Sequence, residues 1–225
     1  SFSIASGRLS YTLDLHGPCV SIDTACSSGL VACHSGRCAL KLGECTVSLV
    51  AAVNLMLQPV ASINFANAGM TSPSGRCHAF DSRADGYARG EACVAVVLSS
   101  SVVANGMLTG SCVRQDGKSA SLTAPNGQAQ QALLRAARTD AFEMLISYLE
   151  AHGTGTALGD PIEAGAFAAA GCSSSANDLA HLSIGGTKAN VGHTEPAAGM
   201  VGMLKLVHFL DHVRSAPNAQ LRVLN

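Results

Sequence analysis

Residues 21–44 read SIDTACSSGLVACHSGRCALKLGE, and this stretch sets the organisation that we expect for the whole chain. The apolar run at residues 20–22 predicts a short strand, and the apolar residues that follow recur at helical spacing. Cys26 is therefore expected at a strand-to-helix turn, where unpaired backbone N–H groups and the helix dipole favour the nucleophilic thiolate. A free cysteine is more often a buried packing residue, so the rest of the chain must decide its role.

The composition indicates a globular protein with no charged binding face. The chain has 225 residues, a net charge of -1 and 13% charged residues, which is long enough for one large or two small domains. These values argue against a nucleic-acid partner or a polybasic membrane patch. The longest apolar stretches, at residues 47–57 and 164–170, are too short or too interrupted to span a membrane.

Nine cysteines do not form the pattern of a disulfide framework or a zinc site. The chain has no Cys-x-x-Cys pair, and its cysteines lack the clustered spacing of metal ligands. We therefore expect reduced thiols, no bound metal and an intracellular, cytoplasmic location, with an organelle as the alternative.

Strand-like and helix-like segments alternate, which predicts an α/β fold with a buried and largely parallel sheet. Segments rich in Gly and Ser at residues 69–90 and 171–178 are expected to be loops. The expected strands are 20–22, 46–53, 92–98, 108–113, 146–149 and 182–184, and the expected helices are 27–42, 59–67, 128–140, 161–170 and 196–212.

Two histidines stand out because each lies in a glycine-rich turn between an expected strand and an expected helix. His152 follows strand 146–149, and His193 lies between strand 182–184 and helix 196–212. Ligands bind at the carboxyl ends of parallel strands, so these residues and Cys26 are expected to meet there. The helix after His152 begins with a capping pattern, in which Asp160 is the cap and Glu163 the third helical residue.

Five ordered motifs give the chain a resemblance to a known family. They are DTACSS around Cys26, EAHGTGTALGDPIE around His152, KANVGHTEPAAG around His193, and the segments 75–92 and 115–127. The chain resembles a β-ketoacyl synthase domain of the type I polyketide synthase kind. The resemblance implies an α/β, thiolase-like layered αβαβα fold, incomplete at both ends, with residues 1–104 in the amino-terminal half and 105–225 in the carboxy-terminal half. It also implies a homodimer.

The same resemblance implies a mechanism. Cys26 would carry an acyl chain as a thioester, while His152 and His193 would hydrogen-bond the thioester carbonyl of a malonyl unit and stabilise its enolate after decarboxylation. The domain would bind no cofactor of its own, because the substrates travel on the phosphopantetheine arm of an acyl carrier protein. Residues with an implied supporting role are Lys188, Glu163 and Asp160, and those implied in the substrate channel are Thr154 and Thr156.

Several alternatives stay open on the sequence alone. A fatty-acid-type ketoacyl synthase would use the same chemistry, and a non-catalytic partner domain would keep only the fold. A cysteine hydrolase that pairs Cys26 with one histidine would leave the second glycine-flanked histidine unexplained. The family domain is nearly twice as long as this chain, so we expect the 225 residues alone to be inactive and poorly soluble.

Overall fold

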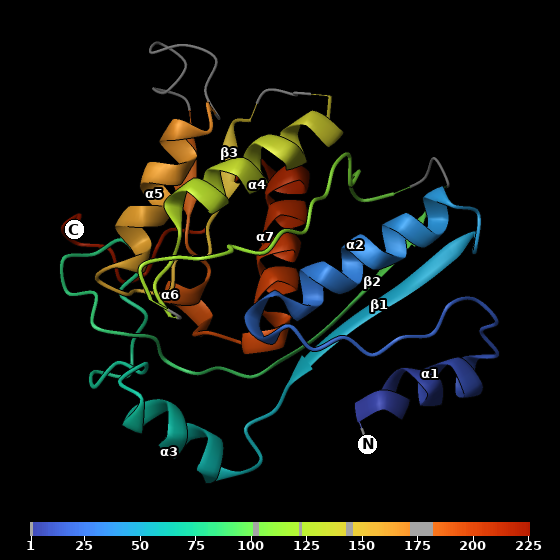
Figure 1. Ribbon diagram of the computed structural model, residues 1–225, viewed down its shortest axis with the longest axis horizontal. Helices are drawn as coiled ribbons and strands as arrows, with labels where there is room; N and C mark the ends of the chain where they lie inside the picture. Colours follow the sequence, from blue (N-terminus) through green and yellow to red (C-terminus); the bar gives the residue numbers. More distant parts are fainter. Residues whose placement is uncertain (1, 101–103, 122, 143–145, 172–181) are drawn as a thin grey trace.

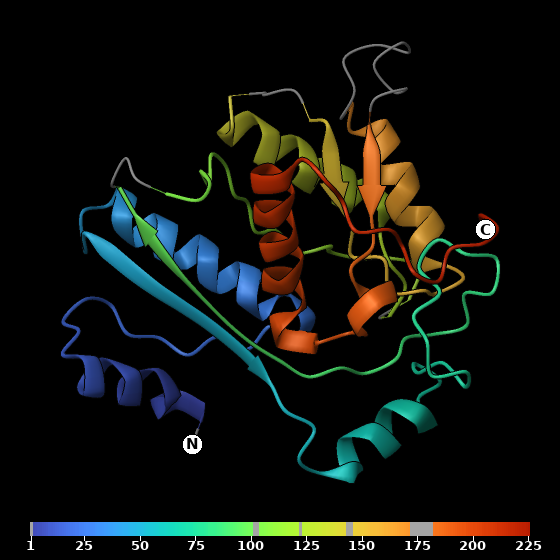
Figure 2. The ribbon, with the colours of Figure 1, turned by 180° about the vertical axis from the view of Figure 1, so that it is seen from behind.

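The computed structural model describes residues 2–100, 104–121, 123–142, 146–171 and 182–225, and two strand pairs organise them (Figure 1). The first pair consists of β1 (Val47–Asn54) and β2 (Ala92–Ser99), and the second of β3 (Tyr148–Glu150) and β4 (Ser183–Gly185). Figure 2 shows the two pairs from behind, with helix α7 (Ala198–His212) standing between them.

The first strand pair packs one face against two helices. Helix α2 (Ser28–Lys41) and α7 cover this face, although they come from opposite ends of the chain. Cys33 of α2, Val50 of β1, Val94 of β2 and Met200 of α7 meet in one buried core. Because α7 begins five residues after His193, this core connects the second half of the chain to the segment that carries Cys26.

The direction and burial of this pair differ from the sequence prediction. β1 and β2 are antiparallel, with Val47 opposite Ser99 and Asn54 opposite Ala92. Alternate residues of β1 are buried, whereas Val47, Leu49 and Val53 are exposed. The expectation of a largely parallel sheet buried on both faces is therefore wrong for this pair. A continuous apolar run indicates a strand, but it carries no information about the direction of pairing.

The second strand pair is parallel, as the alternating pattern predicts. Tyr148 lies opposite Ser183 and Glu150 opposite Gly185. Helices α4 (Gly127–Asp140) and α5 (Gly159–Ala169) pack beside it, and a second core forms around Phe80, Ala151 and Phe167. His152 follows β3 closely, so this pair brings the first histidine motif to a strand end.

The long helices confirm the helices expected from the sequence, and their ends agree with the expected ends to within about two residues. They are α2, α3 (Pro59–Asn67), α4, α5 and α7. Helices α1 (Ala5–Leu13) and α6 (Lys188–Val191) were not expected from the sequence. Helix α6 has a single turn, which is too short to give a periodic signal.

Two expected strands are absent from the part of the chain that the structure describes. Residues 20–22 and 108–113 have irregular backbone there. In the second segment, side chains take up the backbone hydrogen bonds: Arg37 donates to the carbonyls of Leu108 (3.2 Å) and Thr109 (2.6 Å). The carboxylate of Asp140 accepts the N–H of Ser111 at 2.9 Å. A segment whose polar groups are satisfied in this way needs no ladder partner.

Three further expectations concern loops, membranes and thiols. The loop expected at residues 171–178 lies, apart from Gly171, outside the described residues. In the described ranges, no helix has both the length and the apolar character needed to cross a bilayer. Every cysteine that the structure describes is a free thiol.

Candidate active site

Cys26 lies in a tight turn that precedes α2. The turn η2 (Ala25–Ser27) is a single 3-10 turn, and Ala25 has a φ of 53°, in the left-handed region that non-glycine residues seldom adopt. Ser28 holds the turn, because its hydroxyl accepts the N–H of Thr24 at 2.8 Å and donates to the carbonyl of Ala25 at 2.7 Å. These local bonds offset the strain that places Cys26 at the start of the helix.

His152 lies in a loop whose backbone N–H groups are bound by two carboxylates. Glu163 accepts the backbone N–H groups of His152 (2.6 Å) and Gly153 (2.8 Å). Asp160 accepts the N–H of Gly155 at 3.2 Å, and it also accepts the N–H of Phe80 at 2.7 Å. The spacing of these two acids near the start of α5 therefore shapes the loop that presents the histidine.

Asp160 does not cap its own helix as the sequence predicts. Helix α5 begins at Gly159, the capping position is Leu158, and Asp160 is the second helical residue. The carboxylate turns back to the preceding loop, where buried N–H groups would otherwise lack acceptors. The hydroxyl of Thr156 accepts the N–H of Gly159 at 3.2 Å instead.

His193 lies in the turn between α6 and the short helix η4 (Glu195–Ala197). Its side chain is buried, with 5% of the residue exposed. The backbone N–H of Glu195 donates to Nδ1 of His193 at 3.1 Å. The ring also meets the edge of Tyr87, with ring centroids 5.0 Å apart. The strand β4 lies one helix earlier in the chain, so His193 does not follow it directly.

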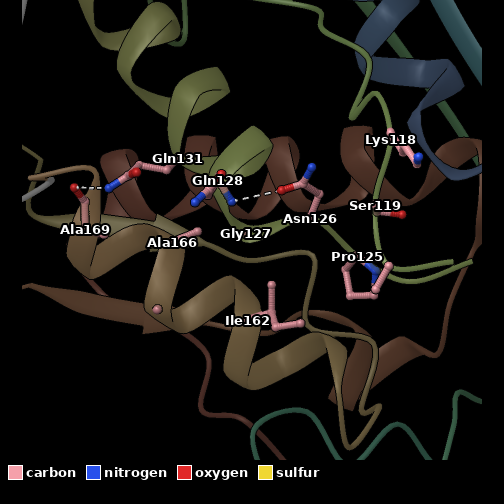
Figure 3. Close-up of a pocket in the computed structure, with 12 residues that line it drawn as sticks. Lys118, Ser119, Pro125, Asn126, Gly127, Gln128, Gln131, Ile162, Ala166 and Ala169 are labelled. Atoms are coloured by element: carbon pink, nitrogen blue, oxygen red, sulfur yellow. Dashed lines mark hydrogen bonds between the residues drawn. The ribbon is translucent and has the colours of Figure 1, made fainter.

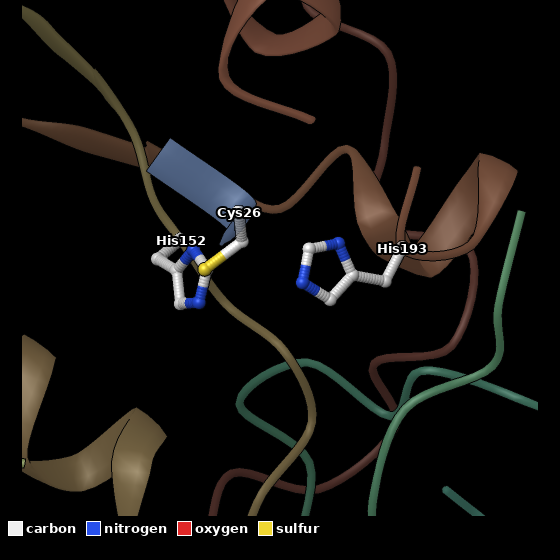
Figure 4. A group of neighbouring side chains, drawn as sticks. All are labelled: Cys26, His152 and His193. Carbon is white, nitrogen blue, oxygen red and sulfur yellow. The ribbon is translucent and has the colours of Figure 1, made fainter. Parts of the chain in front are cut away.

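Cys26, His152 and His193 converge although they come from three separate segments (Figure 4). The sulfur of Cys26 and one ring nitrogen of each histidine lie within 4.8 Å of one another. The two imidazole rings stand nearly perpendicular, with centroids 5.6 Å apart. A reacting carbon placed near the sulfur would therefore have two imidazole nitrogens close to its oxygen.

Lys188 is a buried cation beside this group, with 7% of the residue exposed. Its Nζ donates to the carbonyl oxygen of His152 at 2.5 Å and lies 3.5 Å from Nδ1 of the same residue. Burial lowers the pKa of Lys188, and the nearby charge of Glu163 opposes that change. Burial also raises the pKa of Glu163 and of Asp160.

Both imidazoles are held in the neutral form. Burial, and then the positive charge of Lys188, lower the pKa of His193 to about 3. The pKa of His152 moves in the same direction, first through desolvation and then through Lys188 and His193. By surface area His152 is exposed and His193 is buried, yet burial is the largest cause of the pKa shift at both rings.

The hydrogen bonds around the rings determine which nitrogen of each neutral imidazole carries the proton. In His193, Nδ1 accepts an N–H, so Nε2 carries the proton. In His152, Nδ1 faces an ammonium that can only donate, which also leaves the proton on Nε2. A metal-bound histidine normally donates from its other nitrogen. The spacing of the three side chains would suit a metal ion, but the rings are arranged as hydrogen-bond donors.

Thr154 and Thr156, the residues expected in a substrate channel, lie in the loop that follows His152. Both are half-buried, and their hydroxyl oxygens are 3.3 Å apart. The contact of Thr156 with the start of α5 gives it a structural function in the loop. The channel role stays a prediction.

Sequence reasoning did not single out Tyr87, Arg89 or Glu195, which surround His193. Arg89 and Glu195 form an ion pair across 106 positions of the chain. No local spacing could reveal that pairing. The available signal was that Tyr87 and Arg89 lie in the segment 75–92, which carries part of the family resemblance, and Glu195 in the motif of His193.

A surface hollow of about 580 Å³ lies between α4 and α5 (Figure 3). Ile162 and Ala166 of α5 form one wall, and Gln128 and Gln131 of α4 form another. None of the three converging side chains lines this hollow. We therefore place the candidate active site at the Cys26 turn.

Comparison with known families gives the family of the chain. A family model of the beta-ketoacyl synthase N-terminal domain matches residues 1–104, and one of the C-terminal domain matches residues 105–222. The chain therefore belongs to the beta-ketoacyl synthase family, and its fold is the thiolase-like α/β fold.

Within the family, the similar relatives are polyketide synthases. The chain is 45% identical to a phenolphthiocerol/phthiocerol polyketide synthase of Mycobacterium tuberculosis, over 100% of the chain and 12% of the relative. It is 44% identical to highly reducing polyketide synthase cm3B of Cordyceps militaris, over 96% of the chain and 9% of the relative. The chain thus spans about a tenth of the length of these relatives.

Solved structures with the same fold are ketosynthases. One is the ketosynthase from module 6 of the bacillaene synthase of Bacillus subtilis 168, with a TM-score of 0.92 and 38% identity. Another is the oxazolomycin ketosynthase domain OzmH KS7 of Streptomyces albus JA3453, with a TM-score of 0.94 and 32% identity. Each match covers 100% of this chain and 42% of the solved chain.

Proposed function

We propose that this chain carries the reacting groups of a ketosynthase in a type I polyketide synthase, which joins acyl units by decarboxylative condensation. The observation that carries the proposal is the convergence of the Cys26 sulfur with the two imidazoles within 4.8 Å. The Nε2–H groups of both rings give this site two donors for an oxyanion and one nucleophile. The polyketide synthase relatives support the pathway, with fatty-acid synthesis as the second candidate.

The first half of the reaction transfers an acyl group to Cys26. The thiolate of Cys26 attacks the thioester carbonyl of an acyl chain carried by an acyl carrier protein. The bond from the carbonyl carbon to the carrier's sulfur breaks, and the carrier leaves as a thiolate that takes up the proton lost by the Cys26 thiol. The strained turn at Ala25 places Cys26 at the start of α2.

The second half forms the carbon–carbon bond. A malonyl thioester loses carbon dioxide when its carboxylate carbon–carbon bond breaks, and the electron pair passes to the thioester as an enolate. The Nε2–H groups of His152 and His193 donate to the enolate oxygen. Loss of one such donor typically lowers kcat by about 10²–10³-fold. The enolate carbon then attacks the Cys26 thioester and expels the thiolate, which restores the free enzyme.

Lys188, Glu163 and Asp160 act on this chemistry through His152. Lys188 holds the carbonyl of His152 and faces its Nδ1, while the two acids hold the loop backbone. The proposal includes no metal and no cofactor held by the chain. The phosphopantetheine arm of an acyl carrier protein delivers both substrates, with Thr154 and Thr156 along its path, and the full domain acts as a homodimer.

The test uses the longest natural reading frame that contains this chain. A radiolabelled acyl thioester should label the wild-type protein and leave Cys26→Ala unlabelled. Carbon dioxide release from malonyl carrier protein should fall by about 100-fold in both His152→Ala and His193→Ala.

Three other results would each contradict the proposal. Labelling that survives Cys26→Ala would mean that another residue is the nucleophile. A wild-type protein that takes up no label and releases no carbon dioxide would favour a non-catalytic partner domain. Thioester hydrolysis without carbon dioxide release would favour a hydrolase.

A further inference from the structure

The turn that carries His193 requires support from outside, because Glu195 has a left-handed backbone. Its φ is 44°, a conformation that costs a non-glycine residue roughly 1–2 kcal/mol. This conformation accompanies the 3.1 Å bond in which the N–H of Glu195 donates to Nδ1 of His193. The protonation pattern of the ring therefore depends on a strained turn.

An ion pair holds the side chain of Glu195. Arg89 donates to both carboxylate oxygens, at 2.5 Å from Nε and 3.1 Å from Nη2. The two side chains are 9% and 17% exposed, so water screens the pair little. Two-point contact fixes the plane of the carboxylate as well as its distance.

Arg89 is itself fixed from the opposite side by α3. Its Nη1 donates to the hydroxyl of Ser62 at 2.6 Å, and its guanidinium lies 5.2 Å from the centre of the Phe65 ring. The backbone beside Arg89 is bound to His193, whose N–H donates to the carbonyl of Ala88 at 2.7 Å. The N–H of Gly90 donates to the carbonyl of His193 at 2.9 Å. The guanidinium and the histidine are therefore parts of one rigid unit.

We propose that Arg89 and Glu195 are positioning residues for His193. Their ion pair holds the left-handed turn that aims the Glu195 N–H at Nδ1, and this keeps the proton on Nε2, the atom that faces Cys26 and the substrate. Neither side chain touches the reacting atoms. This inference rests on the proposed function and adds two residues to it.

Several charged or titratable groups face His193 and bear on any test that uses pH. Tyr87 and Cys77 come from the segment that contains Arg89, and Cys26, His152 and Lys188 come from the reacting group. Loss of the Arg89 guanidinium leaves the carboxylate of Glu195 without its partner. The turn can then relax, so that the N–H of Glu195 no longer donates to Nδ1 of His193. Both changes favour protonation of His193, so they act in the same direction.

The test compares Arg89→Ala, Arg89→Lys and the exposed control Arg114→Ala in the same full-length protein. For malonyl decarboxylation, we expect Arg89→Ala to lower kcat by about 10–100-fold with KM changed by less than about threefold. The acid limb of its pH profile should move to higher pH. Arg89→Lys should recover part of kcat, because it keeps the charge but loses the two-point contact. Arg114→Ala should match the wild type.

A second readout does not depend on turnover. We expect the rate of Cys26 alkylation by iodoacetamide at pH 6, divided by that at pH 8, to rise roughly threefold in Arg89→Ala, because an imidazolium stabilises the thiolate. Unchanged kcat and an unchanged alkylation ratio in Arg89→Ala would overturn the inference. Equal losses in Arg89→Ala and Arg89→Lys with no change in pH dependence would also overturn it, since packing alone would explain them. If the wild type releases no carbon dioxide, the proposed function fails, and the alkylation ratio still decides this inference.

Discussion

The two histidine turns place chemically equivalent rings, yet they are built in different ways. The His152 turn is held by Glu163 on the next helix and by Lys188, and Gly86 from the first half of the chain donates to the carbonyl of Gly155. The His193 turn is held by Arg89, which lies 106 positions away from its partner Glu195. By surface area His152 is exposed, whereas His193 is buried with 5% of the residue exposed.

This difference shows that one requirement, a neutral ring with its proton on Nε2, has two structural solutions. At His152, an ammonium faces Nδ1 directly, and buried carboxylates fix the backbone. At His193, a backbone N–H occupies Nδ1, and the ion pair acts only through the turn. Removal of a charge should therefore affect His152 directly, whereas at His193 it should act through backbone geometry.

The largest expected effect comes from Lys188→Met, which removes the ammonium while keeping the length and apolar body of the side chain. His152 loses the donor to its carbonyl, and Glu163 loses its nearby positive charge. We expect kcat for malonyl decarboxylation to fall by about 100-fold or more, which is the size of a lost electrostatic contact in an active site. Carbon dioxide release measures this change, and the exposed Lys118→Met is the matched control. Activity above half of wild type would show that His152 needs no buried cation.

Much of this site could be predicted from the sequence, because its parts are local motifs. Cys26, His152 and His193 each lie in a short glycine-bearing or small-residue segment, and the structure brings all three together. The long helices were also predictable, since their apolar residues recur at helical spacing. The order of these motifs along the chain gave the family resemblance.

The remaining features depend on contacts between residues that are far apart in the sequence, and local sequence patterns cannot predict such contacts. The antiparallel pairing of β1 with β2 follows from packing against α2 and α7, which an apolar run cannot specify. The irregular segment at residues 108–113 follows from Arg37, whose side chain reaches its carbonyls. The support of His193 by Arg89 has the same origin.

A smaller effect is expected from Gly155→Ala, which tests the rigidity of the His152 turn. Gly155 has a φ of 78°, and a Cβ there would lie 2.6 Å from the backbone nitrogen of His78. We expect a loss of roughly 2–4 kcal/mol in the free energy of unfolding, from backbone strain and overpacking together. Urea denaturation of the purified protein measures it.

The control for this change is Gly165→Ala in α5, where an added Cβ meets no atom within 4 Å and the backbone is helical. There the substitution should stabilise the protein by about 0.5–1 kcal/mol. A Gly155→Ala protein as stable as the wild type would mean that the His152 turn can relax, and the contrast between the two turns would weaken.

The smallest effect is a pH dependence of stability that arises because both rings are neutral in the folded protein. The pKa of His193 is about 3 in the folded protein and near 6.5 when unfolded, so the unfolded state binds the extra proton between these values. His193 therefore contributes stability that is fully present above about pH 6.5 and is lost as the pH falls toward 3. One such proton gives a slope approaching roughly 1.4 kcal/mol per pH unit.

Urea midpoints between pH 5 and 6.5 measure this slope, and they should show a flatter dependence in His193→Asn than in the wild type. His152→Asn should flatten it to a similar extent, because burial is the largest cause that lowers the pKa of both rings to about 3. An unchanged slope in either variant would mean that the corresponding ring is not held neutral by burial in the folded protein.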